Sequence, residues 1–218
     1  MSEDLAGRKA QTRAAFNRIA PEYDVAGPGC FAHYGRRLVE VAGVEAGQRV
    51  LDVATGRGAV LVPAAERVGA TGEVIGIDLA EGMVDAANAE VVRRGLAAMV
   101  RVMDAERLDF PDASFDAITV PFVITLVPDP EGALDEMRRV LKPGGEIVIA
   151  SKLGADEGPV MHIEAALAPM MKKVGWSIAF KASRLRNWAA RHPDMSVTDI
   201  SPVFPVGFFK LVRIKKAA

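Results

Sequence analysis

Residues 50–58 read Val-Leu-Asp-Val-Ala-Thr-Gly-Arg-Gly, an apolar run that ends in an acid and passes directly into a glycine loop. Helix-forming residues 59–68 follow. The loop is therefore predicted to join a buried strand to a helix at the carboxyl edge of a parallel α/β sheet, where ligands bind. Gly56 and Gly58 would let the backbone approach a ligand closely. Such a loop often only makes a tight turn, so it does not establish a site alone.

Two further apolar runs lead into an acid at equal intervals of about one βα unit. Residues 72–78 end at Asp78, and residues 99–103 precede Asp104. A carboxylate at the tip of the second strand can accept two hydrogen bonds from a ribose diol. A fourth run, 115–120, carries its acid near its start instead. Three acids at successive strand ends indicate a site and not a solubilising surface.

Size and composition limit the class of protein. The 218 residues suit one domain, and a net charge of −1 from 27 basic and 28 acidic residues argues against nucleic acid as the main partner. One cysteine and three scattered histidines predict no disulfide framework and no metal site. No apolar run approaches the ~20 residues that cross a bilayer. We expect a cytoplasmic protein.

The chain outside these runs is predicted as follows. Residues 1–20 form a basic helix that is a lid, a solvated arm or a segment lying on an anionic membrane. Residues 121–127 form an apolar loop suited to a substrate wall, and Met83 either covers a flat ring or packs the core. A helix is expected to open within residues 78–82 and to stop at Gly95. The remaining expected elements are helices 35–42, 130–141, 159–174 and 183–191, a stop at 142–145, and strands 146–151, 195–200 and 207–214, the last two antiparallel.

Four blocks, residues 50–58, 74–83, 102–118 and 139–151, together resemble the class I S-adenosylmethionine-dependent methyltransferases over residues 45–151. The resemblance implies an α/β, Rossmann-like fold with a seven-stranded sheet of order 3-2-1-4-5-7-6, strand 7 antiparallel and helices on both faces. One domain, 1–218, would then comprise lid or membrane-contact helices (1–44), a cofactor-binding core (45–151), and substrate-side helices with the final strands (152–218).

The same resemblance implies a cofactor, S-adenosyl-L-methionine, with S-adenosyl-L-homocysteine as product. The glycine loop would hold the methionine end, Asp78 the ribose, and Met83 with Asp104 the adenine. Ala54 stands where the family has its first glycine. Alanine costs little there if its φ is negative, so we expect cofactor binding to survive. The full set of implied cofactor-binding residues is Asp52, Ala54, Thr55, Gly56, Gly58, Asp78, Leu79, Met83, Asp104, Ala105 and Pro121.

Within the family the two halves of the chain resemble different groups. The N-terminal half, with Ala-Pro-Glu-Tyr-Asp at 20–24, resembles ubiquinone and menaquinone biosynthesis and natural-product methyltransferases. The later half resembles soluble-type bacterial phosphatidylethanolamine N-methyltransferases through residues 121–124, 127–130, 158–159, 175–176 and 205–211. The first expectation is phospholipid N-methylation with peripheral contact to the inner face of the membrane. The alternative is O-, N- or C-methylation of a small metabolite.

Methyl transfer requires few catalytic groups, because an amine acceptor only has to arrive unprotonated. The candidates are Tyr23, which could close over the cofactor or orient an amine, and His162, which could act as a base. Two other classes of function were weighed. A non-catalytic cofactor-binding module stays open. A dinucleotide oxidoreductase is disfavoured, because Leu61 stands at the last fingerprint glycine.

Overall fold

The computed structural model describes residues 2–23, 30–154, 180–203 and 209–218. Its seven strands form one sheet in the order β3-β2-β1-β4-β5-β7-β6, which confirms the predicted topology. The strands are β1 Arg49–Val53, β2 Glu73–Asp78, β3 Ala98–Val102, β4 Phe115–Pro121, β5 Leu141–Ser151, β6 Met195–Val203 and β7 Phe209–Lys216.

The strand register places residues of β2, β1 and β4 side by side across the sheet. β1 lies parallel between β2 and β4, and Asp52 pairs in register with Gly76 on one side and Thr119 on the other. Strands β1 to β5 run parallel, so their carboxyl ends share one edge. As expected, β7 is antiparallel to both of its neighbours, β5 and β6.

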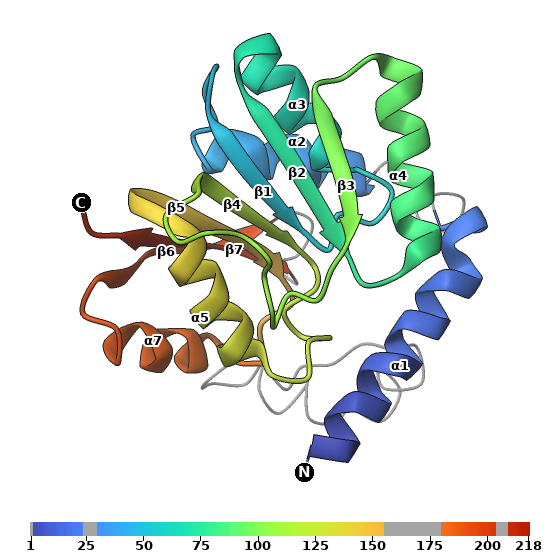
Figure 1. Ribbon diagram of the computed structural model, residues 1–218. Coiled ribbons are helices and arrows are strands. Elements are labelled where there is room, and N and C mark those ends of the chain that lie inside the picture. The colour runs from blue at the N-terminus through green and yellow to red at the C-terminus, as the bar shows by residue number, and fades with distance from the viewer. Residues whose placement is uncertain (1, 24–29, 155–179, 204–208) are drawn as a thin grey trace.

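Helices cover both faces of the sheet, as expected (Figure 1). Each face of the sheet has its own hydrophobic core, and alternate side chains of β1 point into one or the other. Leu51 packs in the core with α5 and α7, and Val50 packs in the core with α2, α3 and α4. In Figure 1, α1 stands apart from the sheet, beyond the carboxyl ends of β1 to β3. The helices are α1 Ser2–Ile19, α2 Cys30–Val41, α3 Leu61–Val68, α4 Glu81–Arg94, α5 Pro130–Val140 and α7 Ala182–Ala190, with 3₁₀ turns Ala20–Glu22 and Gly69–Thr71.

Three predicted boundaries differ most from those of the structure. β5 begins at Leu141 and not at Glu146, because residues 142–145 form an irregular extension of the strand in which Gly144 has φ +79°. β6 continues to Val203, through the segment that was expected to link the last strands. α2 begins at Cys30, before the predicted start. The predicted helix 159–174 lies outside the described residues.

Two of the basic residues near the end of the chain, Arg213 and Lys216, form contacts within the fold. Arg213 of β7 makes bidentate contacts of 2.7–3.0 Å with Glu146 of β5. Lys216 Nζ donates to the carbonyl oxygens of Arg138 and Leu141, each at 2.7 Å. Within the described ranges, no helix has the length and apolar character needed to span a bilayer.

Candidate functional site

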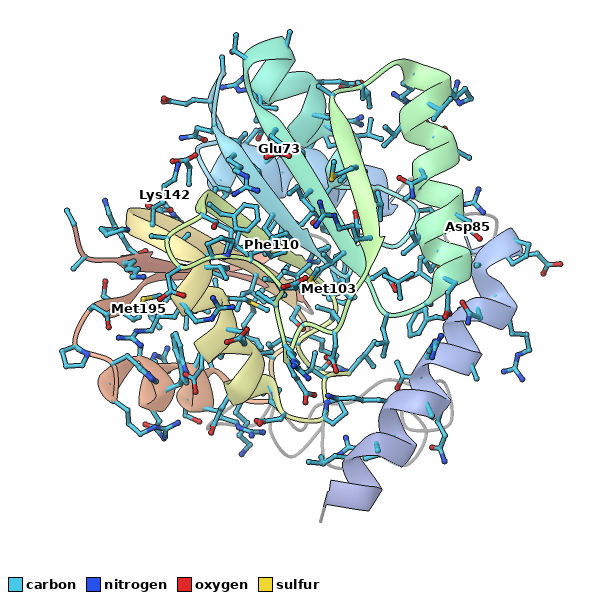
Figure 2. All side chains as sticks on the ribbon, in the orientation of Figure 1. Glu73, Asp85, Met103, Phe110, Lys142 and Met195 are labelled. Carbon is cyan, nitrogen blue, oxygen red and sulfur yellow. The ribbon has the colours of Figure 1, made fainter. Side chains whose placement is uncertain are left out.

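A cavity of about 640 Å³ opens at the carboxyl edge of the sheet, where the ends of β1 to β4 meet α1 and α2. In Figure 2, Met103, which lines this cavity, lies at that edge, and Glu73 lies at the opposite one. Ten of the predicted cofactor residues line it: Ala54, Thr55, Gly56, Gly58, Asp78, Leu79, Met83, Asp104, Ala105 and Pro121. The predicted cofactor residues, except Asp52, therefore lie around one cavity at this edge of the sheet.

Asp52 lies beneath the glycine loop and is fully buried. Its two carboxylate oxygens accept hydrogen bonds from the hydroxyls of Thr55, at 2.6 Å, and Thr119, at 2.7 Å. Burial raises the pKa of Asp52 to about 7. The two hydroxyl donors lower this pKa, and the nearby charge of Asp78 raises it. Asp52 therefore fixes the loop to β4 and does not reach the cavity wall. Thr119, the polar residue among the buried residues of β4, was the unrecognised sign of this network.

Replacing Asp52 by asparagine is expected to change the pH dependence of stability. The pKa of this carboxyl is about 7 in the fold and about 4 in the unfolded chain, so the wild type loses stability as pH rises through that window. The amide cannot ionise. The free energy of unfolding of the variant, minus that of the wild type, should therefore rise by about 2–3 kcal/mol between pH 5 and pH 8. Urea denaturation at both pH values measures it, and a constant difference contradicts the expectation.

The loop contains a strained alanine, so Ala54 does not meet the condition of a negative φ under which alanine would cost little. Ala54 has φ +57°, and Gly56 and Gly58 are also left-handed at +55° and +94°. The loop turns back so that the Thr55 N–H donates to Ile77 of β2 at 2.9 Å. The left-handed residues thus lie on either side of the contact that Thr55 makes with β2. A residue with a side chain costs ~1–2 kcal/mol there.

Asp78 is held in place by backbone donors. The N–H of Gly56 donates to one of its oxygens and the N–H of Ala80 to the other, each at 2.9 Å. Burial raises the pKa of Asp78, although these donors lower it. A carboxylate has about four acceptor positions, so it retains capacity for hydroxyl donors from a ligand. The geometry suits a diol.

Helix α1 closes one side of the cavity through ion pairs with the core. Lys9 Nζ lies 2.7 Å from Asp104 and 2.5 Å from Glu106. Burial lowers the pKa of Lys9, but the hydrogen bonds and charges of these carboxylates raise it overall. Arg13 pairs with Glu81 at the start of α4. These contacts support the lid interpretation of residues 1–20. Sequence reasoning did not identify Lys9, because a lysine on a basic helix carries no signal of its partner.

Of the two predicted catalytic residues, Tyr23 and His162, the structure describes the first. Tyr23 lines the cavity, and with Phe16 it packs against the buried cluster of Ala20, Ala80 and Met83. Its ring centroid lies 6.1 Å from that of Phe16. His162 lies outside the described residues. The described residues therefore place Tyr23 at the site, as proposed, and do not test the proposal for His162.

The segment after β4 begins with a second strained residue, Phe122, at φ +57°. Its N–H donates to Ala150 of β5 at 2.6 Å. Its ring packs edge-on against Tyr34 at 5.4 Å and Phe209 at 5.1 Å, so three elements hold it. Strain maintained by surrounding contacts is typical of functional sites. No residue pattern around position 122 predicts this backbone conformation.

The fold and cavity define an α/β protein that binds a nucleoside at the carboxyl edge of its sheet. The comparisons give the family. Residues 51–149 match the methyltransferase domain family. The chain is 43% identical over 195 residues to the aklanonic acid methyltransferase DauC of Streptomyces sp. (strain C5), covering 86% of this chain and 88% of that one. It is 36% identical over 172 residues to a phosphatidylethanolamine N-methyltransferase of Cereibacter sphaeroides, covering 78% and 81%.

A ubiquinone/menaquinone biosynthesis C-methyltransferase of Laribacter hongkongensis is 34% identical over 199 residues, covering 88% of this chain and 80% of that one. A solved S-adenosylmethionine-dependent methyltransferase from Aquifex aeolicus superposes with a TM-score of 0.70 at 22% identity, covering 93% of this chain and 98% of that one. The chain belongs to the class I S-adenosylmethionine-dependent methyltransferases and is an enzyme of that family.

The described residues fit this cofactor. The cavity volume of about 640 Å³ lies within the range of ~300–1,000 Å³ usual for ligand sites. Asp78 has acceptor capacity left for ribose hydroxyls, and the buried Met83 offers an apolar surface for a ring. The carboxylates suit a sulfonium cation. Neither a metal nor a phosphate site is needed.

Proposed function

We propose that this enzyme methylates a small, largely apolar metabolite inside the cavity beside α1. The observation that carries the proposal is the wall formed by the segment after β4. Its cavity-lining residues are all apolar: Phe122, Val123, Leu126, Val127 and Pro128. An apolar acceptor gains binding energy when such a wall removes it from water. This segment supplies no charge to a lipid phosphate.

The proposed cofactor contacts follow from the positions of the lining residues. The ribose hydroxyls bind the Asp78 carboxylate, the adenine lies against Met83 with its amino edge toward Asp104 and Ala105, and the methionine end lies at loop 54–58. When bound, the cofactor supplies a methyl group on a sulfonium. The chain's own residues hold the acceptor in line with that group and exclude water, which is most of what a methyl displacement needs.

Asp104 now pairs with Lys9, so adenine has to share or replace that contact. Glu106, at 2.5 Å from the same ammonium, keeps Lys9 paired when it does. We propose that α1 stays docked through Glu106 while adenine uses Asp104. Tyr23, packed beside Met83, then closes the site over the cofactor.

A phospholipid acceptor, which the sequence favoured, is the second candidate for the substrate. The similarity to the Cereibacter enzyme favours it, since that protein is named for phosphatidylethanolamine. The basic residues that suggested membrane contact give it less support. Lys9 and Arg13 of α1 pair with carboxylates of the core, and Arg213 of β7 pairs with Glu146. Carboxylates paired with these cations reduce the attraction of anionic lipid to them.

An acceptor assay distinguishes the two candidates. The enzyme is incubated with methyl-labelled cofactor and either aklanonic acid, as a probe of apolar metabolites, or liposomes of phosphatidylethanolamine with anionic lipid. We expect label in the small molecule and none in the extracted lipid. Labelled lipid alone would reverse the order of the candidates.

A variant of the wall tests its role in acceptor binding. Leu126→Arg places a charge in the apolar wall and should lower kcat/KM for the small acceptor at least about tenfold. S-adenosylhomocysteine affinity, measured by calorimetry, should be retained. The matched control is Val92→Arg, because Val92 is 79% exposed on α4 and does not line the cavity. Equal activity of both variants would contradict the proposed wall.

A further inference from the structure

We infer that Arg36 binds the α-carboxylate at the amino-acid end of the cofactor. The family resemblance gave this residue no role. Arg36 belongs to α2, is exposed, and lines the cavity together with the glycine loop. The inference concerns cofactor binding, so it holds whichever acceptor the enzyme uses.

The charges around the loop create the need for a cation. Asp52 lies directly beneath the loop, and Asp78 accepts a hydrogen bond from Gly56 within it. These carboxylates favour the positive sulfonium and ammonium groups of the cofactor. They repel its carboxylate, which needs a positive partner when it leaves water.

The other cations lining the cavity are engaged elsewhere. Lys9 and Arg13 pair with acids of the core. Arg57 donates to the carbonyl oxygen of Ala20 at 2.7 Å. Two further arginines, Arg93 and Arg94, pair with Glu90 on the surface of α4. Among the described residues that line the cavity, Arg36 is the cation for which the structure records no partner.

The position of α2 places Arg36 at the end of the cavity beside the glycine loop, where the amino-acid end of the cofactor is proposed to bind. The preceding residue, Gly35, is buried against the backbone between the loop and α3, so closely that an added side-chain carbon would overlap the Ala59 carbonyl oxygen. Arg36 therefore follows a fixed point next to Gly58. Its guanidinium can bind a carboxylate through two parallel hydrogen bonds.

Two ligands that differ only in the amino-acid end provide the test. S-adenosylhomocysteine carries the carboxylate, and 5′-methylthioadenosine lacks the whole amino-acid end. We expect Arg36→Gln to weaken S-adenosylhomocysteine binding roughly 10- to 100-fold in calorimetry and to leave 5′-methylthioadenosine binding unchanged. Arg36→Lys should give an intermediate loss, because lysine keeps the charge without the paired donors.

Arg37→Gln is the matched control. Arg37 is the next residue of the same helix, but it pairs with Glu40 at 3.0 Å and does not line the cavity. Its affinity for both ligands should equal that of the wild type. Equal losses of both ligands in Arg36→Gln would show a structural role for Arg36 and overturn the inference. Unchanged binding of S-adenosylhomocysteine would overturn it as well.

Discussion

Replacing Asp78 by alanine is expected to weaken the binding of S-adenosylhomocysteine by about 3 kcal/mol, roughly 150-fold. The carboxylate is proposed to accept two ribose hydroxyls, and hydrogen bonds to charged groups contribute ~1.5–3 kcal/mol each. The same change leaves the Gly56 and Ala80 N–H groups without their acceptor. Calorimetry with the purified variant measures the loss. Asp85→Ala is the control, because Asp85 is an exposed acid of α4 outside the cavity (Figure 2).

The ribose role can be separated from support of the loop. Adenosine and 2′,3′-dideoxyadenosine differ only in the hydroxyls proposed to bind Asp78. The wild type should prefer adenosine, and the variant Asp78→Ala should bind both equally. If the variant keeps the full preference for adenosine, another group holds the ribose and Asp78 only supports the loop.

Replacing Gly35 by alanine is expected to lower the free energy of unfolding by about 3 kcal/mol, and the melting temperature by about 6–12 °C. Helix propensity alone predicts the opposite sign, a gain of ~1 kcal/mol for glycine to alanine within a helix. The steric effect dominates, since the new methyl group would overlap the Ala59 carbonyl oxygen and α2 would have to move off the loop. The shift should also weaken S-adenosylhomocysteine binding by displacing Arg36.

Gly7 provides the matched control for this substitution. It lies in α1, is exposed, and an added side-chain carbon there would meet no atom within 4 Å. Gly7→Ala should therefore follow helix propensity and leave stability equal or slightly higher. Thermal unfolding of both variants gives the comparison. A Gly35→Ala protein as stable as Gly7→Ala would mean that α2 is not packed against the loop as described.

The ends of the strands were the part of the site that could be predicted. The acids at 52, 78 and 104 follow apolar runs at equal spacing, and parallel strands bring such positions to one edge. Two of them, Asp78 and Asp104, line the cavity. Strand order came from the family resemblance and was confirmed, because spacing along the chain does not determine which strands are neighbours.

Features that depend on packing between distant segments could not be predicted. The left-handed Ala54 precedes Thr55, whose N–H donates to Ile77 of β2, and β5 extends through 142–145 because Leu141 and Glu146 on either side of these residues pair with β4. Lys9 and Arg36 are ordinary surface cations in the sequence. Their difference, one paired with Asp104 and the other without a recorded partner, exists only once α1 and α2 are docked.

The position of β7 has a consequence for how the protein is made. β7 is the last strand along the chain, yet it lies inside the sheet and pairs with β5 on one side and β6 on the other. During synthesis, β5 leaves the ribosome with an open edge, and β6 follows without a neighbour. Open edges of this kind are sites of aggregation. The sheet is complete only when residues 209–216 pair with both β5 and β6. Until then, the edges of β5 and β6 stay unpaired and the nascent chain remains prone to aggregation.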